Sequence, residues 1–459
     1  MLAAQPNAAT ADLRMAALLG SLSHALDLVE GQPPGHCVRC CWIGVQIGHE
    51  IGLSEAEIFD LYYAVLLKDL GCSSNAARIC QLFLTDDVNF KRDSKTVDTQ
   101  SLSQAIRFIL ADTGLKAGLA ERFKAIFTAC RKSGEITREL IETRCHRGAD
   151  IARRMHFSEA VAEGIENLDE HWDGKGQPAG RRGKAIPIYS RVALLAQIVD
   201  VFHTVNGIPA ALQEIRRRSG TWFDPDLVSA FEHIAARPAF WDTLGSASIE
   251  KALFALEPAQ QTILLDDSYL DDIAAAFAEV IDAKSPFTRG HSERVTLFAD
   301  MIGQQLGLNE PKRRQLKRAA SLHDIGKLGV SNSVLDKPGK LDDAEWNDMR
   351  MHPVYSEQIL SRAAAFADLA RIGGGHHERL DGKGYPRGLK GDEIDLETRI
   401  VTVADIFDAL SADRPYRAAM PIAQELSIMS EMVDTAIDRT CFEALKVALQ
   451  ALDPTAESK

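Results

Sequence analysis

The stretch GHSERVTLFADMIGQQLGLNEPK at residues 290–312 decides the fold class. Its apolar residues, among them Val295, Phe298 and Ile302, recur at steps of three and four positions, which places them on one face of an α-helix. Gly307 marks the end of that helix. Most other periodic segments have the same spacing, and runs with the strict alternation of a strand are hard to find. The sequence therefore predicts an all-α fold.

A second stretch repeats this pattern early in the chain. GHCVRCCWIGVQIGHEIGLSEAE at 35–57 parallels 290–312, and 32 residues after each histidine comes a matched tetrapeptide, KDLG at 68–71 and HDIG at 323–326. Further on, EHWDGKGQPAG at 170–180 matches ERLDGKGYPRG at 378–388. Self-similarity at a preserved spacing indicates tandem copies of one structural unit. We predict two domains, over residues 1–258 and 259–459.

The two predicted copies differ mainly in one interval. Between Asp69 and His146 the chain is 49 residues longer than between Asp324 and His352. The first copy is therefore expected to carry an insertion near residues 76–140.

Composition and charge exclude several classes of protein. The net charge of −13 argues against binding of a nucleic-acid polymer, which depends on clustered Lys and Arg. No segment has the roughly 18 consecutive apolar residues of a membrane-spanning helix, and the N-terminal residues lack a signal-peptide pattern. The eight cysteines are unevenly spaced, so no disulfide framework is expected. We expect a cytoplasmic protein without a membrane partner.

The candidate catalytic residues gather in the second copy. After residue 233 the sequence has five histidines, each in a short motif beside glycine or carboxylate residues: His291, His323, His352, His376 and His377. A single histidine on an apolar face is usually a hydrogen-bonded core residue. Five in such motifs favour a metal site.

Asp405 supplies an independent argument, because the surrounding RIVTVADIFDAL reads as a buried helix. A buried carboxylate needs a cation, either Arg399 or Arg414 in a salt bridge or a metal ion. Five imidazoles with two carboxylates and no nearby thiol favour iron, manganese or zinc. More than four ligands implies more than one ion.

Together these motifs resemble the HD-GYP branch of the HD superfamily, across roughly residues 266–450. HDIGK at 323–327, HP at 352–353, HHE at 376–378 and GYP at 384–386 follow the family's order, with His291 before them and Asp405 after them. The resemblance implies one metal ion held by His291, His323, Asp324 and Asp405, and a second held by Asp324, His352, His376 and His377. Asp324 would bridge two divalent transition-metal ions, with iron or manganese favoured and zinc or nickel as alternatives. Some members hold a third ion through a glutamate four residues before the first histidine; Phe287 stands there in this chain, so we expect two ions.

The resemblance also implies hydrolysis of a cyclic dinucleotide, by ions that activate a water molecule and neutralise the phosphodiester. Asp324 and Lys327 are the expected catalytic residues, with Lys327 stabilising charge or assisting the leaving group. Gly384 and Tyr385 are expected to line the substrate side, and Arg414 and Arg417 to clamp a second phosphate.

Three functions remain open. A phosphodiesterase of cyclic di-GMP ranks first. The alternatives are an HD phosphohydrolase acting on another nucleotide, for example cyclic GMP-AMP, and a non-catalytic cyclic-dinucleotide sensor or adaptor. A homodimer is a further possibility.

The first copy has lost most of these residues. By motif alignment, it keeps His36, Asp69 and His146 at the positions of His291, Asp324 and His352. At the positions of His323, His376, His377, Asp405, Lys327 and Tyr385 it has Lys68, Leu168, Asp169, Gln197, Cys72 and Gln177. A lysine among the ligands repels a divalent cation, so we expect no hydrolysis in this copy. Regulation, dimerisation and ligand sensing are its candidate roles.

Overall fold

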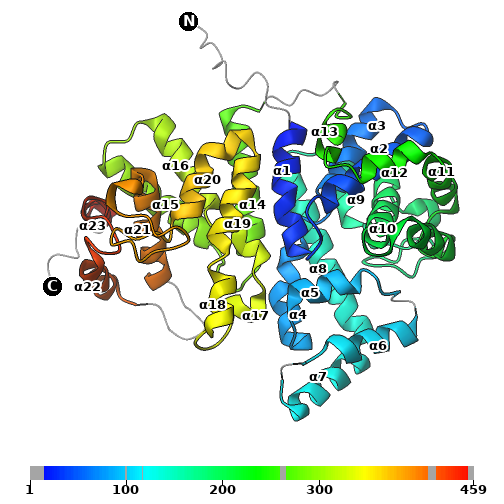
Figure 1. Cartoon of the computed structure of the whole chain (residues 1–459), viewed down its shortest axis with the longest axis horizontal. Coiled ribbons are helices and arrows are strands. Elements are labelled where there is room, and N and C mark those ends of the chain that lie inside the picture. The colour runs from blue at the N-terminus through cyan, green and yellow to red at the C-terminus, as the bar shows by residue number, and fades with distance from the viewer. Residues whose placement is uncertain (1–14, 99–100, 116, 259–264, 412–419, 453–459) are drawn as a thin grey trace, which may run out of the picture. The chain divides into compact units, whose positions relative to one another are not determined.

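The computed structural model describes residues 15–98, 101–115, 117–258, 265–411 and 420–452 (Figure 1). Within these residues the regular elements are helices, and the only β-type pairings are three isolated bridges. The predicted all-α fold is confirmed. The chain divides into two compact units, Met1–Tyr269 and Leu270–Lys459. The division falls beyond the predicted boundary at 258/259, inside helix α14.

Unit 1 begins with α1 (Met15–Val29), α2 (His36–Glu50) and α3 (Glu55–Leu66), followed by the short helix η1 (Cys72–Asn75). Four helices occupy most of the predicted insertion: α4 (Ala76–Phe83), α5 (Asp87–Ser94), α6 (Leu102–Asp112) and α7 (Leu119–Arg131). The unit then continues through α8 (Ser133–Arg154), α9 (Glu159–Glu166), η2 (Gly183–Ala185), α10 (Ile188–Arg218), α11 (Pro225–Ala235), α12 (Pro238–Leu244) and α13 (Ile249–Phe254).

The main core of unit 1 lies where α2, α3, α9 and α10 pack together. The insertion has a separate apolar core, formed by Ile79, Phe83, Phe90, Ile109, Ala129 and Ile136. Figure 1 shows α6 and α7 at the lower edge of this unit, away from α2 and α3.

Unit 2 repeats the same order of elements without the insertion. Its helices are α14 (Asp267–Asp282), α15 (His291–Gln305), α16 (Glu310–Leu322), η3 (Ile325–Gly329), α17 (Asn332–Leu335), α18 (Asp343–Met349), α19 (His352–Arg362), η4 (Ala364–Phe366), α20 (Ala367–Gly375), η5 (Gly391–Glu393), α21 (Leu396–Ser411), α22 (Ile422–Met432) and α23 (Arg439–Leu452). Its core is formed by α15, α16, α19, α20 and α21.

A glycine starts the first shared helix in each unit. Gly290 precedes α15 with φ 68°, and Gly35 precedes α2 with φ 84°. Such left-handed backbone favours glycine, which has no Cβ. The turn places His291 and His36 at the first position of their helices, with both side chains buried.

Helix α10 is long and apolar enough to span a membrane by composition alone. More than half of its most apolar window is buried within the fold, and Gly207 with Pro209 interrupts its helical geometry. A core helix meets the same criteria, so α10 is weak evidence for a membrane span. The cytoplasmic location and the lack of a membrane partner remain predictions.

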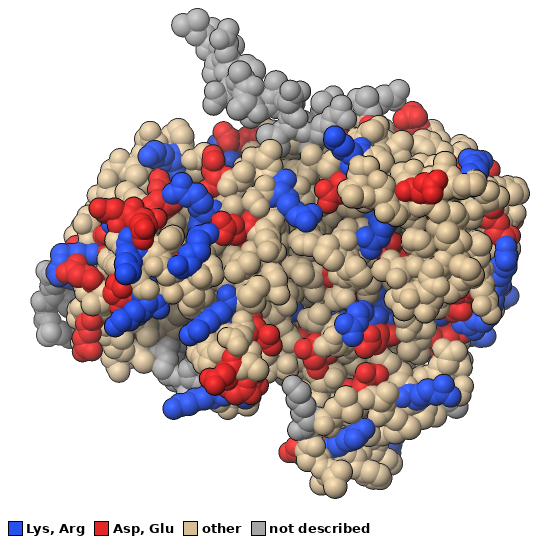
Figure 2. Space-filling model, in the orientation of Figure 1, with Lys and Arg blue, Asp and Glu red and all other residues tan. Residues whose placement is uncertain are grey.

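Charges of both signs are interspersed on the face that Figure 2 shows, without a broad basic area. The prediction that no nucleic-acid polymer binds rests on this mixture and on the net charge.

Candidate metal centre and active site

The seven predicted ligands come from separate elements of unit 2 that meet at one buried point. His291 starts α15, the His323–Asp324 pair follows α16, and His352 starts α19. His376 and His377 follow the end of α20, and Asp405 lies inside α21. Five of the seven side chains are almost fully buried, whereas His377 is half-buried and the side chain of Asp405 is 12% exposed.

Asp324 lies at the centre, and its two oxygens face different histidines. Oδ2 is 3.3 Å from Nε2 of His291 and 3.3 Å from Nε2 of His323. Oδ1 is 3.5 Å from Nε2 of His352 and 3.6 Å from Nε2 of His376. One carboxylate therefore connects two groups of nitrogen donors.

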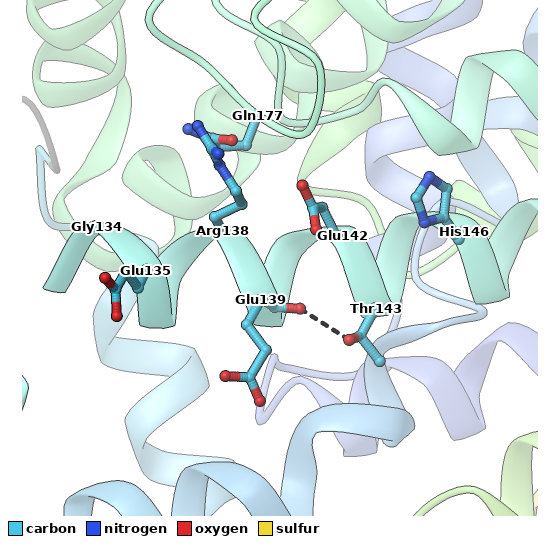
Figure 3. Close-up of a pocket in the computed structure, with 8 residues that line it drawn as sticks. All are labelled: Gly134, Glu135, Arg138, Glu139, Glu142, Thr143, His146 and Gln177. Atoms are coloured by element: carbon cyan, nitrogen blue, oxygen red, sulfur yellow. Dashed lines mark hydrogen bonds between the residues drawn. The ribbon is translucent and has the colours of Figure 1, made fainter. Parts of the chain in front are cut away.

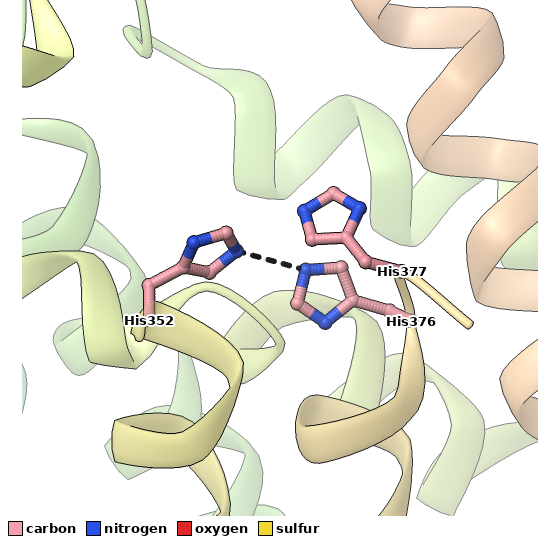
Figure 4. Close-up of side chains that lie close together, drawn as sticks. All are labelled: His352, His376 and His377. Atoms are coloured by element: carbon pink, nitrogen blue, oxygen red, sulfur yellow. Dashed lines mark hydrogen bonds between the residues drawn. The ribbon is translucent and has the colours of Figure 1, made fainter. Parts of the chain in front are cut away.

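Asp405 and His377 complete the two groups. Oδ1 of Asp405 is 3.4 Å from Nε2 of His291 and 3.8 Å from Nε2 of His323. On the other side, Figure 4 shows His352, His376 and His377 converging, with Nε2 of His352 3.3 Å from Nε2 of His376. The donor atoms of these three histidines lie close enough to hold one ion.

Four of the histidines are oriented through their other ring nitrogen. Nδ1 of His323, His352 and His376 lies 2.7–2.8 Å from the backbone carbonyls of Ala320, Met349 and Gly373, respectively. Nδ1 of His291 lies 2.7 Å from Oδ2 of Asp408. Donation from Nδ1 leaves the Nε2 lone pair facing the site, which is the usual arrangement of a metal-binding histidine.

Buried atoms without hydrogen bonds support the same interpretation. Within the described residues, Nε2 of His291, Nε2 of His323 and Oδ1 of Asp324 are buried and lack a hydrogen-bond partner. Buried polar atoms are almost always satisfied in folded proteins. The donor set, imidazole and carboxylate without thiolate, fits divalent transition metals.

The pKa values of the side chains follow from burial and from the charges that surround them. Burial lowers the pKa of His323, but Asp324 and Asp405 outweigh burial and raise that pKa to about 10. Burial lowers the pKa of His352 to about 3, so His352 is neutral at physiological pH. The pKa of Asp324 is well below its usual value because the charges of His323 and Lys327 outweigh its burial. The carboxylates therefore attract a cation strongly.

The predicted substrate residues have different surroundings. Lys327 places Nζ 2.5 Å from Oδ2 of Asp324, at the partly exposed rim of the site. The ring of Tyr385 packs 4.9 Å from the ring of His377. Gly384 packs against the backbone of residues 377–379, where a Cβ would come within 2.4 Å of a backbone nitrogen. Arg414 and Arg417 lie outside the described residues.

Sequence reasoning missed Asp408, Arg294 and Arg350, which lie near the site. Asp408 is fully buried and accepts hydrogen bonds from His291 and Arg294. Its spacing of three residues from Asp405, on the same helix face, was a usable signal. Arg350 lies with its guanidinium 5.6 Å from the centre of the Tyr385 ring, and no motif points to it.

In unit 1 the corresponding site holds protein cations. The ammonium group of Lys68 forms an ion pair with Asp69 and lies 3.2 Å from Nε2 of His36. Lys95, from the insertion, pairs with Glu30 at 2.7 Å. The ammonium of Lys68 thus lies between the histidine and the aspartate. The corresponding residues of unit 2 are His291, His323 and Asp324, whose donor atoms lie close enough to hold an ion.

The alignment of His146 with His352 is wrong. Gly326 packs so closely on the backbone of α19 that a Cβ there would lie 1.9 Å from the carbonyl oxygen of His352. Gly71 packs on α8 in the same way, and a Cβ there would lie 1.8 Å from the carbonyl oxygen of Arg144. Arg144 is therefore the counterpart of His352, and its Nε donates to Asp169 at 2.8 Å.

His146 lies one half-turn further along α8, in an open hollow of about 760 Å³ that Figure 3 shows. Its side chain is 59% exposed, and Nε2 is 3.4 Å from Glu166. Identity of residue type misled the alignment because the insertion removes any fixed spacing between Asp69 and the next motif.

Comparison with known proteins supports the fold. The model of the HD domain family matches residues 94–227 and 275–441. The chain belongs to the HD domain family. The predicted resemblance is thereby confirmed, and each of the two units contains a matched segment.

Two curated relatives and one crystal structure are similar over different lengths. The chain is 56% identical over 435 residues to the 3'3'-cGAMP-specific phosphodiesterase 3 of Vibrio cholerae, covering 95% of this chain and 94% of that protein. It is 42% identical over 170 residues to the cyclic di-GMP phosphodiesterase response regulator RpfG of Xanthomonas campestris, covering 37% of this chain and 45% of that protein. The crystal structure of a cyclic GMP-AMP specific phosphodiesterase of V. cholerae has a TM-score of 0.66 and 50% identity, covering 95% of this chain and 98% of that one.

Proposed function

We propose that the second copy hydrolyses 3'3'-cGAMP in preference to cyclic di-GMP, at a centre of two metal ions. The chain is a cyclic-dinucleotide phosphodiesterase, as the sequence predicts, because its relatives over both long and short alignments have that activity. The relative that matches 95% of the chain acts on 3'3'-cGAMP, whereas the cyclic di-GMP phosphodiesterases match 40% or less. Similarity over the full length favours the mixed dinucleotide.

The observation that carries the metal centre is the position of Asp324. Its Oδ2 faces His291 and His323, and its Oδ1 faces His352 and His376. We infer that Asp324 bridges two ions, the first completed by Asp405 and the second by His377. Nitrogen and oxygen donors without thiolate favour iron or manganese, with zinc or nickel as alternatives.

When bound, two such ions would supply an activated water and neutralise charge on the phosphodiester. The side chains of the protein provide the rest. The Nδ1 hydrogen bonds fix four imidazoles before substrate arrives, so little reorganisation is needed during the reaction. Lys327, at the rim of the site, can place its ammonium beside a phosphodiester oxygen or the leaving ribose oxygen. Tyr385, packed on His377, offers an aromatic face to a base.

A substrate panel with metal analysis tests this function. The purified full-length protein should contain about two equivalents of transition metal per chain and should hydrolyse 3'3'-cGAMP with a higher kcat/KM than cyclic di-GMP. Removal of metal by a chelator should abolish both activities, and adding metal back should restore them. A higher kcat/KM for cyclic di-GMP would overturn the substrate proposal alone. Failure to hydrolyse either dinucleotide with two ions bound would overturn the function.

We also propose a homodimer formed through α6 and α7. Leu119, Phe123 and Phe127 on α7 recur every four residues and are 87%, 74% and 59% exposed. Ile106 and Leu110 on α6 are likewise exposed, at 39% and 49%. Such a stripe of large apolar side chains on one helix face is unusual for a surface in water.

The exposed area fits a dimer. These side chains expose roughly 500 Å² of apolar surface per chain. Two copies together would bury nearly the total of about 1,200 Å² that is found in a small stable interface. Sedimentation analysis should show a dimer for the parent, a monomer for Phe123→Asp and a dimer for Lys124→Asp, which adds the same residue beside the stripe. A dimer that survives Phe123→Asp contradicts the proposed interface.

A further inference from the structure

A second cavity lies in unit 1, between the degenerate site and the helical insertion. Its volume is about 550 Å³, within the range of small-molecule sites. One wall consists of the counterparts of the second copy's ligands, among them Arg144, Asp169 and Gln197. The opposite wall is apolar and includes Phe83 and Phe108 from the insertion. The insertion therefore turns a former catalytic site into a cavity with a polar end and an apolar end.

The cations that line this cavity are paired. Arg144 donates to Asp169 at 2.8 Å, and Lys95 lies 2.7 Å from Glu30. The other two lining lysines follow the same rule, Lys91 lying 3.5 Å from Asp87 and Lys175 lying 3.2 Å from Asp173. Because each positive charge has a carboxylate partner, the cavity has no surplus charge to bind the two phosphates of a cyclic dinucleotide.

Two polar atoms in the wall lack partners. Oε1 of Gln177, an acceptor, and Nε1 of Trp222, a donor, are buried without a hydrogen bond within the described part of the chain. Trp222 is 9% exposed, and its ring stacks on His171 with centroids 4.1 Å apart. An unsatisfied buried donor and acceptor cost stability that a ligand with the complementary groups would recover.

We propose that the first copy binds a neutral, mostly apolar small molecule that carries one hydrogen-bond donor and one acceptor, as a carboxamide does. The donor of the ligand satisfies Gln177, its acceptor satisfies Trp222, and its apolar body lies among the phenylalanines of the insertion. Charge balance excludes an anionic head group. The first copy is thus a ligand receptor attached to a hydrolase, with a ligand class different from that of the substrate.

A series of ligands with one chain and different head groups tests this proposal by calorimetry on the full-length protein. Decanamide, decanol and decanoate at pH 8 share an apolar body and differ in charge and in hydrogen-bonding groups. Decanamide should bind most tightly, decanol several-fold more weakly, and decanoate at least about tenfold more weakly, since its charge finds no free cation.

Matched variants locate the binding. Gln177→Leu and Trp222→Phe should each lower the affinity for decanamide by about five- to tenfold, which is the effect of one lost hydrogen bond. Gln81→Leu makes the same replacement on the exposed face of α4 and should leave binding unchanged. Trp222→Phe removes the N–H but keeps an aromatic ring, so it tests the site even if Gln177→Leu folds poorly.

Three results with this ligand series would each overturn the proposal: decanoate binding as tightly as decanamide, no binding of any of the three up to the solubility limit, or binding unaffected by both site variants. A last experiment measures the binding of 3'3'-cGAMP to Asp324→Ala, in which the second copy is expected to be inactive. Binding of 3'3'-cGAMP that persists in this protein but is lost when Gln177→Leu is added would show that the first copy takes the substrate class instead. Hydrolysis is not a readout in these experiments, so their failure is distinct from failure of the proposed function.

Discussion

Replacing Asp408 with asparagine tests whether orientation of His291 controls the metal centre. Asp408 is fully buried, and its Oδ2 lies 2.7 Å from Nδ1 of His291. Burial raises the pKa of Asp408, but the hydrogen bonds from His291 and Arg294 outweigh it and lower that pKa. The acceptor is therefore a carboxylate. Asparagine has the same shape without the charge.

The expected loss follows from the type of hydrogen bond. A bond to a charged acceptor contributes about 1.5–3 kcal/mol and a neutral one about 0.5–1.5 kcal/mol. The difference of about 1–2 kcal/mol predicts a loss of roughly tenfold in metal affinity, at the lower limit for residues that support metal ligands. Arg294 is 41% exposed and can turn to solvent, so its loss of a partner adds little.

The first copy contains the matched control. Asp200 lies 2.7 Å from Nδ1 of His36 and 2.6 Å from Nε of Arg39, so Asp200→Asn breaks the same contacts where no catalysis is expected. Metal affinity is measured by competition with a chelator, activity by kcat/KM, and folding by thermal denaturation. Asp408→Asn should weaken metal binding and hydrolysis together, whereas Asp200→Asn should affect stability alone. Unchanged metal affinity in Asp408→Asn, or an equal loss in Asp200→Asn, would refute the reasoning.

Two further predictions concern the division of labour and the pH dependence of stability. Asp324→Ala should remove both ions and all hydrolysis, as measured by metal analysis and kinetics. Asp69→Asn should retain kcat but lower the free energy of unfolding in denaturant titrations by about 3 kcal/mol, because Lys68 stays buried without its partner. Burial alone would raise the pKa of Glu30, but the charge of Lys95 outweighs burial and lowers that pKa from 4.5 to about 2. The ionised carboxylate therefore stabilises the fold above pH 4.5, and this contribution is lost as the pH falls towards 2. Lys95→Met should therefore cost about 3 kcal/mol at neutral pH and progressively less below about pH 4, in denaturant titrations across that range; a pH-independent difference would count against the pair.

The sequence was sufficient to predict the helices and the seven residues that lie together in unit 2. Short motifs with fixed internal spacing carried that information, since His323 and Asp324 are adjacent and His376 and His377 are adjacent. It was insufficient where an insertion intervenes. The residue that takes the place of His352 in the first copy is Arg144, and only the packing of Gly71 on its carbonyl reveals this. Lys95 was missed for the same reason, because an inserted segment has no counterpart for comparison.

The two copies together separate what the fold requires from what the chemistry requires. Both keep a buried aspartate, Asp69 or Asp324, that needs a cation beside it. In the first copy Lys68 provides that cation permanently, and His36 stays neutral because burial and the charge of Lys68 lower its pKa to about 4. In the second copy the same position holds His323, whose pKa Asp324 and Asp405 raise to about 10 against the effect of burial, so that His323 and Lys327 are the cations beside Asp324.

A histidine can release its proton when a metal ion arrives. Lys68 is fully buried against Asp69 and His36 and cannot withdraw its ammonium, whereas Lys327, which pairs with Asp324 in the second copy, is partly exposed and can turn towards solvent. We therefore expect the exchange of histidine for lysine at this position to preserve the fold and to oppose metal binding, together with the loss of the other predicted ligands. The Asp200 contact to His36 persists because it supports a buried helix start in either case.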